Sequence, residues 1–161
     1  MVRKIPFIIL SLILAQNFLF AAAPRQTKIA ELANNFTLLD LEDNAVSLSD
    51  FRGKRVILFF WTTWCPHCRR ELRQLNDMQT EFLRSGTQLL AINIEESAGK
   101  VRRFMQNQPC YYKILLDSDA MIAQDYGIVG VPTYVFIDRE GHVTSFSHYF
   151  SQNKYKEMIS R

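Results

Sequence analysis

The sequence predicts an α/β fold in which a central mixed sheet is flanked by helices. Residues 56–60 form a continuous apolar run, which is typical of a strand buried on both faces of a sheet. After this run, apolar residues recur at helical spacing, at Leu72, Leu75, Met78 and Phe82. Strand-like and helix-like segments then alternate up to residue 126 and are followed by a hairpin pattern. We therefore expect largely parallel central strands and an antiparallel edge.

The composition indicates one globular domain without a surface for nucleic acid. The 161 residues are 48% hydrophobic, which is enough for one domain with a buried core. The formal net charge of +3 includes Arg3 and Lys4, and the rest of the chain has 17 basic and 16 acidic side chains. No basic field remains to attract nucleic acid. We expect a monomer.

The N-terminus has the pattern of an export signal. Two positive charges at residues 3–4 precede residues 5–23, which are uncharged and mostly apolar. Ala21 and Ala23 suit cleavage, whereas Pro24 should hinder it, and an uncleaved segment is nearly long enough to span a bilayer. Either outcome predicts a periplasmic or other extracytoplasmic domain, secreted or anchored by its N-terminus. The expected parts are residues 1–23 as a signal peptide or N-terminal membrane anchor, residues 24–34 as a linker, and residues 35–161 as the domain.

The remaining elements follow from local patterns in chain order. Residues 36–41 and 45–48 flank a turn, which predicts a short N-terminal β-hairpin before a polar loop at residues 49–54. The first long helix should end near Gly86, because glycine is typical of the position after a helix. Further expected elements are a strand at 88–94, a helix at 97–107, a strand at 114–117, a helix at 120–126, a hairpin of 133–137 and 142–146, and a helix from 151.

Two cysteines stand where the central strand passes into the first long helix. Cys65 and Cys68 enclose Pro66, which suits the first helical position, and His67, a potential cation. Unpaired N–H groups and the positive end of the helix dipole should favour the Cys65 thiolate. Cys68 lies close enough to form a disulfide with Cys65. We expect Cys65 to be the exposed nucleophile and Cys68 the more buried partner of a redox-active dithiol.

A structural disulfide or half of a zinc site is the simpler alternative for this pair. Zinc would normally need a second pair of ligands, and the sequence has no other Cys-x-x-Cys. Cys110, the third cysteine, is expected to be a small semi-buried hydrophobic residue. The prediction is therefore a site without metal or organic cofactor.

Two motifs carry a family resemblance: Trp64-Cys65-Pro66-His67-Cys68, and Gly130-Val131-Pro132-Thr133 ahead of an apolar strand. Together they resemble the thioredoxin superfamily, and residues 35–159 look like its exported TlpA/ResA branch of thiol–disulfide oxidoreductases. The resemblance implies a thioredoxin-like fold with Pro132 as a cis-proline facing the dithiol. The 67 positions from Cys65 to Pro132 leave room for one extra βα unit relative to thioredoxin.

The resemblance also implies how a partner would bind. Backbone groups of Val131 would pair with an extended peptide, and Trp64, Pro66 and His67 would border the dithiol. Trp61 could share this surface, although core packing is the simpler expectation for it. The implied partners are protein disulfides or dithiols, with a membrane thiol-transfer protein as electron donor.

Glu71 is a third candidate catalytic residue. It projects onto the same helix face as Cys68 and Leu75, where a desolvated carboxyl group could take the proton from Cys68. TlpA/ResA-type proteins carry a functional glutamate at this position, and Phe59 replaces the buried aspartate of thioredoxin. The alternative is a carboxylate that reaches a nearby arginine.

Two features of the sequence bear on the direction of electron flow, and they point in opposite directions. The TlpA/ResA resemblance implies a reductant, as in cytochrome c maturation, whereas the Pro66-His67 pair matches DsbA-like thiol oxidases. Two other activities could use the same cysteines: a Cu(I) metallochaperone, and a peroxiredoxin-type peroxidase, although Leu58 occupies the proline position of the peroxidase motif. We favour the reductant.

Overall fold

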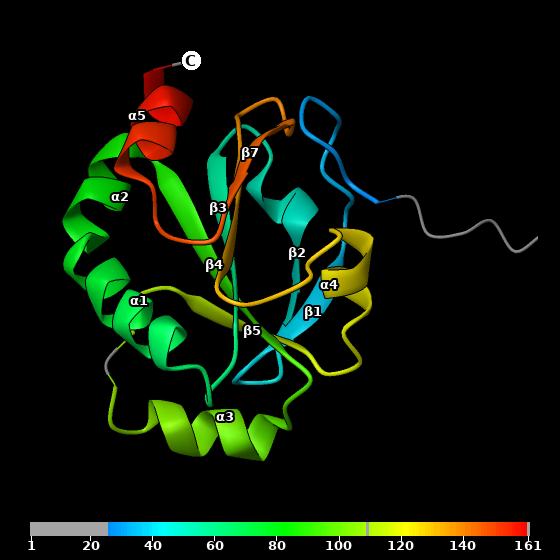
Figure 1. The fold of residues 1–161 in the computed structure, drawn as a ribbon, viewed down its shortest axis with the longest axis vertical. Helices are drawn as coiled ribbons and strands as arrows, with labels where there is room; N and C mark the ends of the chain where they lie inside the picture. The colour runs from blue at the N-terminus through cyan, green and yellow to red at the C-terminus, as the bar shows by residue number, and fades with distance from the viewer. Residues whose placement is uncertain (1–25, 109, 161) are drawn as a thin grey trace, which may run out of the picture.

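A seven-stranded mixed sheet forms the centre of the structure (Figure 1). The computed structural model describes residues 26–108 and 110–160, so the expected signal or anchor at residues 1–23 lies outside the described residues. The strand order is β2-β1-β5-β4-β3-β6-β7. The strands are β1 (Thr37–Asp40), β2 (Ala45–Ser47), β3 (Arg55–Trp61), β4 (Thr87–Ile94), β5 (Lys113–Asp117), β6 (Thr133–Ile137) and β7 (Val143–Ser147).

The direction of the strands confirms the predicted mixed sheet. β3, β4 and β5 run parallel to their neighbours in this group, whereas β6 is antiparallel to β3 and to β7. The predicted N-terminal hairpin, β1 and β2, is present and joins the sheet through an antiparallel pair between β1 and β5. Two strand–helix units therefore lie between the first long helix and Pro132.

The central strand β3 is buried along its whole length, as its apolar sequence predicts. Its side chains alternate between two hydrophobic clusters, because successive residues of a strand point to opposite faces. Phe59 and Trp61 belong to one cluster, and Leu58 and Phe60 belong to the other. Helices must therefore cover both faces of the sheet.

The helices divide between these two faces. They are α1 (Pro66–Asp77), α2 (Gln79–Ser85), α3 (Ala98–Met105), α4 (Met121–Asp125) and α5 (Gln152–Ser160). In Figure 1, α1, α2 and α5 lie on one side of the sheet and α4 on the other. Within residues 26–108 and 110–160, no helix is both long enough and apolar enough to span a membrane.

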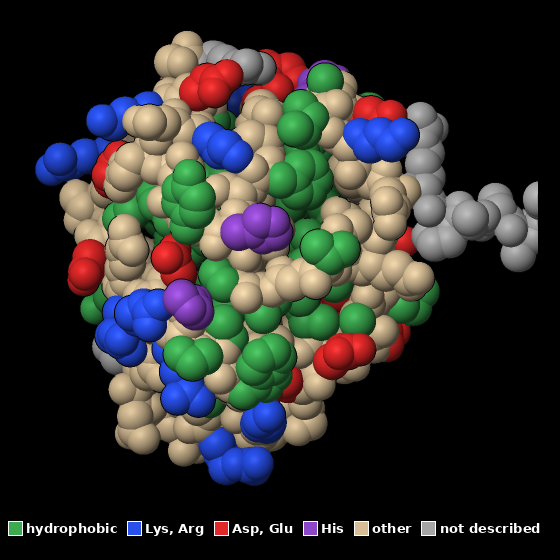
Figure 2. Space-filling model, viewed as in Figure 1, with side chains coloured by type: hydrophobic (Ala, Val, Ile, Leu, Met, Phe, Trp, Pro, Cys, Tyr) green, Lys and Arg blue, Asp and Glu red, His purple; other side chains and the backbone are tan. Residues whose placement is uncertain are grey.

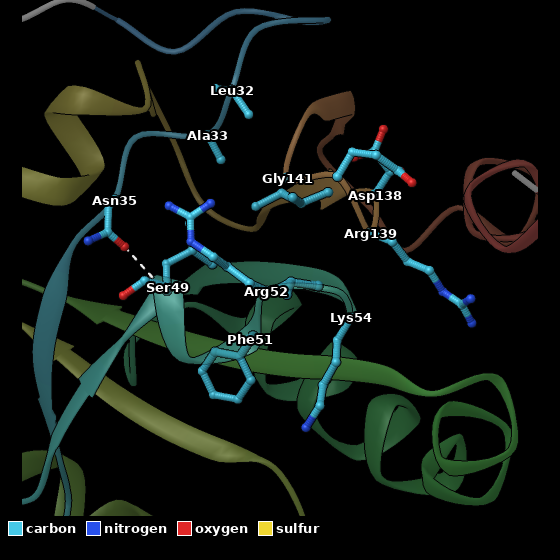
Figure 3. A pocket seen from close by; sticks show the side chains of 14 residues that line it. Leu32, Ala33, Asn35, Ser49, Phe51, Arg52, Lys54, Asp138, Arg139 and Gly141 are labelled. Carbon is cyan, nitrogen blue, oxygen red and sulfur yellow. Dashed lines mark hydrogen bonds between the residues drawn. The ribbon is translucent and has the colours of Figure 1, made fainter.

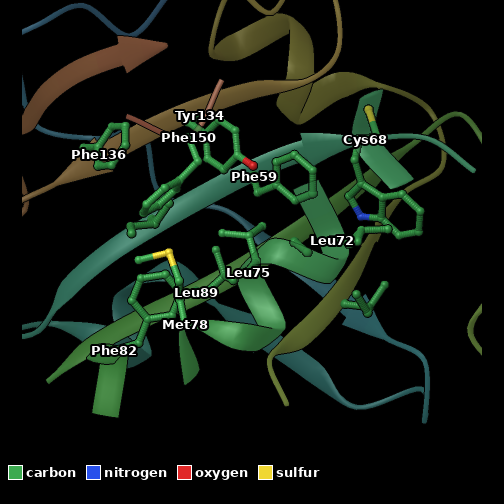
Figure 4. Close-up of a cluster of buried hydrophobic side chains, with 14 of the residues drawn as sticks. Phe59, Cys68, Leu72, Leu75, Met78, Phe82, Leu89, Tyr134, Phe136 and Phe150 are labelled. Atoms are coloured by element: carbon green, nitrogen blue, oxygen red, sulfur yellow. The ribbon is translucent and has the colours of Figure 1, made fainter. Parts of the chain in front are cut away.

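The predicted apolar stripe of the first helix packs against the sheet (Figure 4). Leu72 and Leu75 in α1, Met78 after it and Phe82 in α2 are all buried in the cluster that contains Phe59. The stripe therefore fixes the side of α1 that faces β3, and with it the side that carries Cys68.

The expected continuous helix from residue 66 to residue 85 is wrong at one point. Met78, with φ −87° and ψ 1°, separates α1 from α2. Asn76 and Asp77 precede the break, and both residue types are poor helix formers because their side chains compete for backbone hydrogen bonds. The predicted end at Gly86 is confirmed, since this glycine adopts the left-handed conformation with φ 67°.

The segment before the N-terminal hairpin makes backbone hydrogen bonds to the domain, and the segment after it starts with a short helix. Thr27 donates a backbone hydrogen bond to Asp125 O at 2.9 Å, and Ala33 donates to Gly141 O at 2.9 Å. The segment expected as a linker therefore contacts the domain from Thr27 on. After β2, Leu48–Phe51 form a 3₁₀ helix, η1, in place of the start of the expected loop.

Candidate active site

The side chain of Cys65 caps the N-terminus of α1. Its Sγ accepts a hydrogen bond from Cys68 N at 3.2 Å, and the Cys65 carbonyl accepts from Arg69 N at 3.2 Å. Cys65 has an extended backbone (φ −78°, ψ 114°), and Pro66 follows at the first helical position, as predicted. The sulfur therefore occupies the place at which a helix stabilises an anion.

Cys68 lies one helical turn further and is the more buried thiol of the pair, in which both cysteines are free. Its exposed fraction is 0%, against 4% for Cys65. Cys68 is the more buried of the two, as expected. The expectation that Cys65 is exposed is wrong, because Cys65 is also buried. Burial, together with a hydrogen bond to Cys65, raises the pKa of the Cys68 thiol. A reaction in which Cys68 attacks as a thiolate would therefore need a proton acceptor.

The loop before β6 explains why Cys65 is covered. The thiol of Cys65 points at Val131 O, with an Sγ–O distance of 3.8 Å, and the peptide bond between Val131 and Pro132 is cis. Thr133 Oγ1 donates to Gly130 O at 2.7 Å and closes the turn. The two sequence motifs, which are far apart along the chain, thus meet at the sulfur.

Several exposed side chains surround this meeting point. Pro66 and His67 are exposed, and Trp64 is 62% exposed beside a cavity of about 410 Å³ that Val131 also lines. His67 Nδ1 lies 2.6 Å from a guanidinium nitrogen of Arg70. Figure 2 shows hydrophobic side chains beside lysine and arginine side chains around the N-terminus of α1. Trp61, by contrast, is fully buried and belongs to the core.

Glu71 is a half-buried residue of α1 that contacts β6 and the segment before α5. Its Oε2 accepts hydrogen bonds from Tyr134 Oη at 2.7 Å and from Phe150 N at 3.1 Å. Within the described part of the chain its partners are these two residues rather than an arginine. Burial, and then the hydrogen bond to Glu71, raise the pKa of Tyr134, so its hydroxyl stays a donor.

Glu96 is a residue that the sequence reasoning missed. It is 6% exposed, and both of its carboxylate oxygens accept hydrogen bonds from Thr63, two residues before Cys65. Burial raises its pKa, but hydrogen bonds from Lys100, Asn93 and Thr63 outweigh this effect and hold the pKa below its ordinary value. The available signal was an acidic pair directly after the predicted strand at 88–94, at the edge where parallel strands end.

Other candidate sites do not include the two cysteines of the pair. Cys110 is half-buried, its Sγ donates to Tyr112 O at 3.0 Å, and burial raises its pKa. In the described ranges no group of three or more His, Cys, Asp and Glu side chains could hold a metal ion. A cavity of about 140 Å³ at the opposite end of β3 contains no cysteine (Figure 3). Its lining includes Asn35, Phe51, Arg52, Lys54, Asp138 and Arg139.

Comparison with known proteins agrees with this geometry. Residues 29–146, which include both cysteines of the pair and Pro132, match the AhpC/TSA family. The chain is 32% identical over 116 residues to the thiol-disulfide oxidoreductase ResA of Bacillus thuringiensis subsp. konkukian, covering 72% of this chain and 67% of the relative. ResA of Geobacillus thermodenitrificans is 34% identical over 115 residues, covering 71% of this chain and 66% of the relative. A crystal structure assigned as the thiol:disulfide interchange protein DsbE of Chlorobium tepidum has a TM-score of 0.75 at 28% identity, covering 84% of this chain and 97% of that chain.

Proposed function

Because this chain belongs to the AhpC/TSA family and has a thioredoxin-like fold, we propose that it is an extracytoplasmic thiol–disulfide oxidoreductase acting on partner proteins. One observation carries the proposal. Cys65 Sγ caps α1, accepts a hydrogen bond from Cys68 N at 3.2 Å and faces the loop that contains Pro132. A nucleophilic sulfur with a second thiol one turn away is the arrangement that dithiol exchange requires.

The first step is attack by Cys65 on a partner disulfide. The Cys65 thiolate forms a bond with one partner sulfur, and the other partner sulfur leaves as a thiolate. The product is a mixed disulfide between Cys65 and the partner. Peptide N–H groups at the start of α1 favour the thiolate that begins this step.

The second step is attack by Cys68 on Cys65 Sγ. A new bond joins Cys65 to Cys68, and the partner leaves with both of its sulfurs reduced, so two electrons pass from the dithiol to the partner. The Cys68 thiol must first lose its proton, and burial raises its pKa. We assign this proton to Glu71, which lies one turn after Cys68 with its carboxylate held by Tyr134.

The surface around Cys65 supports docking of an extended peptide. Val131 and Pro132 offer backbone groups next to the sulfur, and Trp64, Pro66 and His67 offer exposed side chains on the other side. A disulfide in such a peptide would lie across Cys65. The cavity beside Trp64 gives room for a neighbouring partner side chain.

We favour the reducing direction, as in cytochrome c maturation, because the chain resembles the TlpA/ResA branch. In this direction the oxidised dithiol is reset by an electron donor, for which a membrane thiol-transfer protein is the proposed class. An N-terminal anchor at residues 1–23, if retained, would hold the domain beside such a donor.

The decisive experiment is the midpoint potential of the Cys65–Cys68 pair, measured in glutathione and dithiothreitol buffers. A reductase should have a value near or below about −270 mV, whereas a value near about −120 mV would indicate a thiol oxidase. The Cys65→Ser variant is the control, because it should show no such redox couple. Turnover of a small disulfide, set against turnover of hydrogen peroxide and against copper content after anaerobic purification, tests the peroxidase and metallochaperone alternatives.

A further inference from the structure

Glu96 forms a buried network directly behind the loop that carries Cys65. Its Oε2 accepts from Thr63 N at 2.6 Å and from Asn93 Nδ2 at 2.8 Å. Its Oε1 accepts from Thr63 Oγ1 at 2.7 Å, and Lys100 Nζ lies 2.6 Å away. All four groups are donors, so the carboxylate is fully satisfied although it is buried.

The turn between β4 and α3 carries this buried carboxylate. Glu95 is exposed and has a positive φ of 55°, an uncommon conformation for a residue other than glycine, and Glu96 directly after it is buried. Asn93, the other donor from this region, lies opposite Trp61 in the parallel pair of β3 and β4. The network therefore joins the end of β4, the first turn of α3 and the loop after β3.

Thr63 is held from both sides. Its N–H and hydroxyl groups donate to Glu96, while its carbonyl accepts a hydrogen bond from Arg69 Nε at 2.7 Å. Thr63 itself is 5% exposed, so without Glu96 its N–H group would be buried with no acceptor. The loop would then have to move, because a buried unpaired N–H costs about 1–3 kcal/mol.

We propose that Glu96 is a positioning residue for the reactive cysteine: its carboxylate fixes the Thr63 peptide and thereby keeps Cys65 Sγ on the N-terminus of α1. This inference rests on the proposed thiol–disulfide activity. The sulfur keeps its hydrogen bond to Cys68 N only while the short segment from Thr63 to Cys65 holds its course. A displaced sulfur would lose this contact, and its thiolate would be less stabilised.

Two variants separate position from charge. Glu96→Gln loses the charge but keeps an oxygen that can accept from Thr63 N, and Lys100, whose side chain is 50% exposed, can turn to solvent. Glu96→Asp keeps the charge, but its shorter side chain cannot reach Thr63 in the same geometry. Glu140→Asp, on the exposed turn between β6 and β7, is the matched control.

The measurement is the rate at which iodoacetamide alkylates Cys65 in the reduced full-length chain, followed by mass spectrometry from about pH 4 to pH 10. We expect Glu96→Asp to move the pH profile upward and to lower the rate at neutral pH by about tenfold, while Glu96→Gln stays within about threefold of wild type. Near-ultraviolet circular dichroism identifies the variants that fold. If Glu96 had only a structural role, the pH profile of Cys65 alkylation in these folded variants would be unchanged.

Two results would overturn the inference. One is an unchanged profile for Glu96→Asp, and the other is a reversed order in which Glu96→Gln is impaired and Glu96→Asp is not, which would indicate a charge effect. A wild-type profile no different from that of a free cysteine would instead refute the proposed activity itself. The two failures are therefore distinguishable.

Discussion

The hydroxyl of Tyr134 donates a hydrogen bond to Oε2 of Glu71 at 2.7 Å. Tyr134 is fully buried in β6, two residues after Pro132, and its ring stacks on Phe59 with a centroid distance of 4.7 Å. The contact therefore ties the carboxylate of α1 to the strand that follows the cis peptide bond. Glu71 does not move freely on the helix surface.

We predict that Tyr134→Phe will keep the fold but alter the second step of exchange. Loss of the hydroxyl leaves the Glu71 carboxylate with Phe150 N and should lower the free energy of unfolding by about 1.5–3 kcal/mol, the range for hydrogen bonds to charged groups. Urea denaturation gives the stability, and the pH profile of disulfide turnover gives the effect on chemistry. Tyr149→Phe, on a side chain that is 64% exposed, should change neither.

The Glu71→Gln variant should slow the release of the partner. The amide cannot take the Cys68 proton, so the rate at which the mixed disulfide resolves should fall by about a hundredfold near neutral pH. The rate of Cys65 alkylation should change little. Stopped-flow kinetics separates the two steps, and Glu81→Gln in α2 is the control. Equal rates of resolution in wild type and Glu71→Gln would remove Glu71 from the mechanism.

The Cys68→Ser variant should trap a mixed disulfide between Cys65 and a partner. Without the second thiol the covalent complex cannot resolve, and it should be visible on non-reducing gels and by mass spectrometry. Cys65→Ser should form no complex. Cys110→Ser should behave as wild type, because the half-buried Cys110 thiol donates its hydrogen bond to Tyr112 O. A complex that forms through Cys110 would contradict the assignment.

The buried carboxylate of Glu96 should make stability depend on pH in acid. Its pKa is held below the ordinary value of 4.5 by hydrogen bonds that outweigh burial, so the unfolded chain binds this proton more readily than the folded chain. The stabilisation is therefore complete above pH 4.5 and is lost as the pH falls through the folded-state pKa. Urea midpoints from about pH 7 to pH 3 should fall less steeply for Glu96→Gln than for wild type. Parallel curves for the two proteins would contradict the prediction.

Leu75→Ala should be among the costly substitutions in the core. Leu75 has an exposed fraction of 0% and packs in the cluster between α1 and β3, so truncation should lower the free energy of unfolding by about 2–5 kcal/mol. Leu83→Ala, at a side chain that is 70% exposed, should change it by less than about 0.5 kcal/mol. Comparable decreases in the free energy of unfolding for the two variants would show that the apolar stripe of α1 does not supply the stabilising contacts.

The amino-acid sequence by itself determined the parts that depend on local pattern. The apolar run of β3, the stripe of Leu72 and Leu75, and the placement of Cys65 at the start of α1 all follow from residue spacing. Periods of 2 and 3.6 residues are encoded within a few neighbouring side chains, so they can be predicted without knowledge of the fold. The sequence did not predict the break at Met78, because the low helix propensity of one or two residues is a weaker signal than an apolar stripe that continues past them.

Only the tertiary structure decided which distant groups meet at the dithiol. The approach of Cys65 to Val131, the bond from Tyr134 to Glu71 and the clamp of Glu96 on Thr63 each join residues more than 30 positions apart. Such contacts depend on the strand order and on the register between β3, β4 and β6, which no local period encodes. The same long-range packing covers Cys65 more deeply than its position on a helix end would suggest.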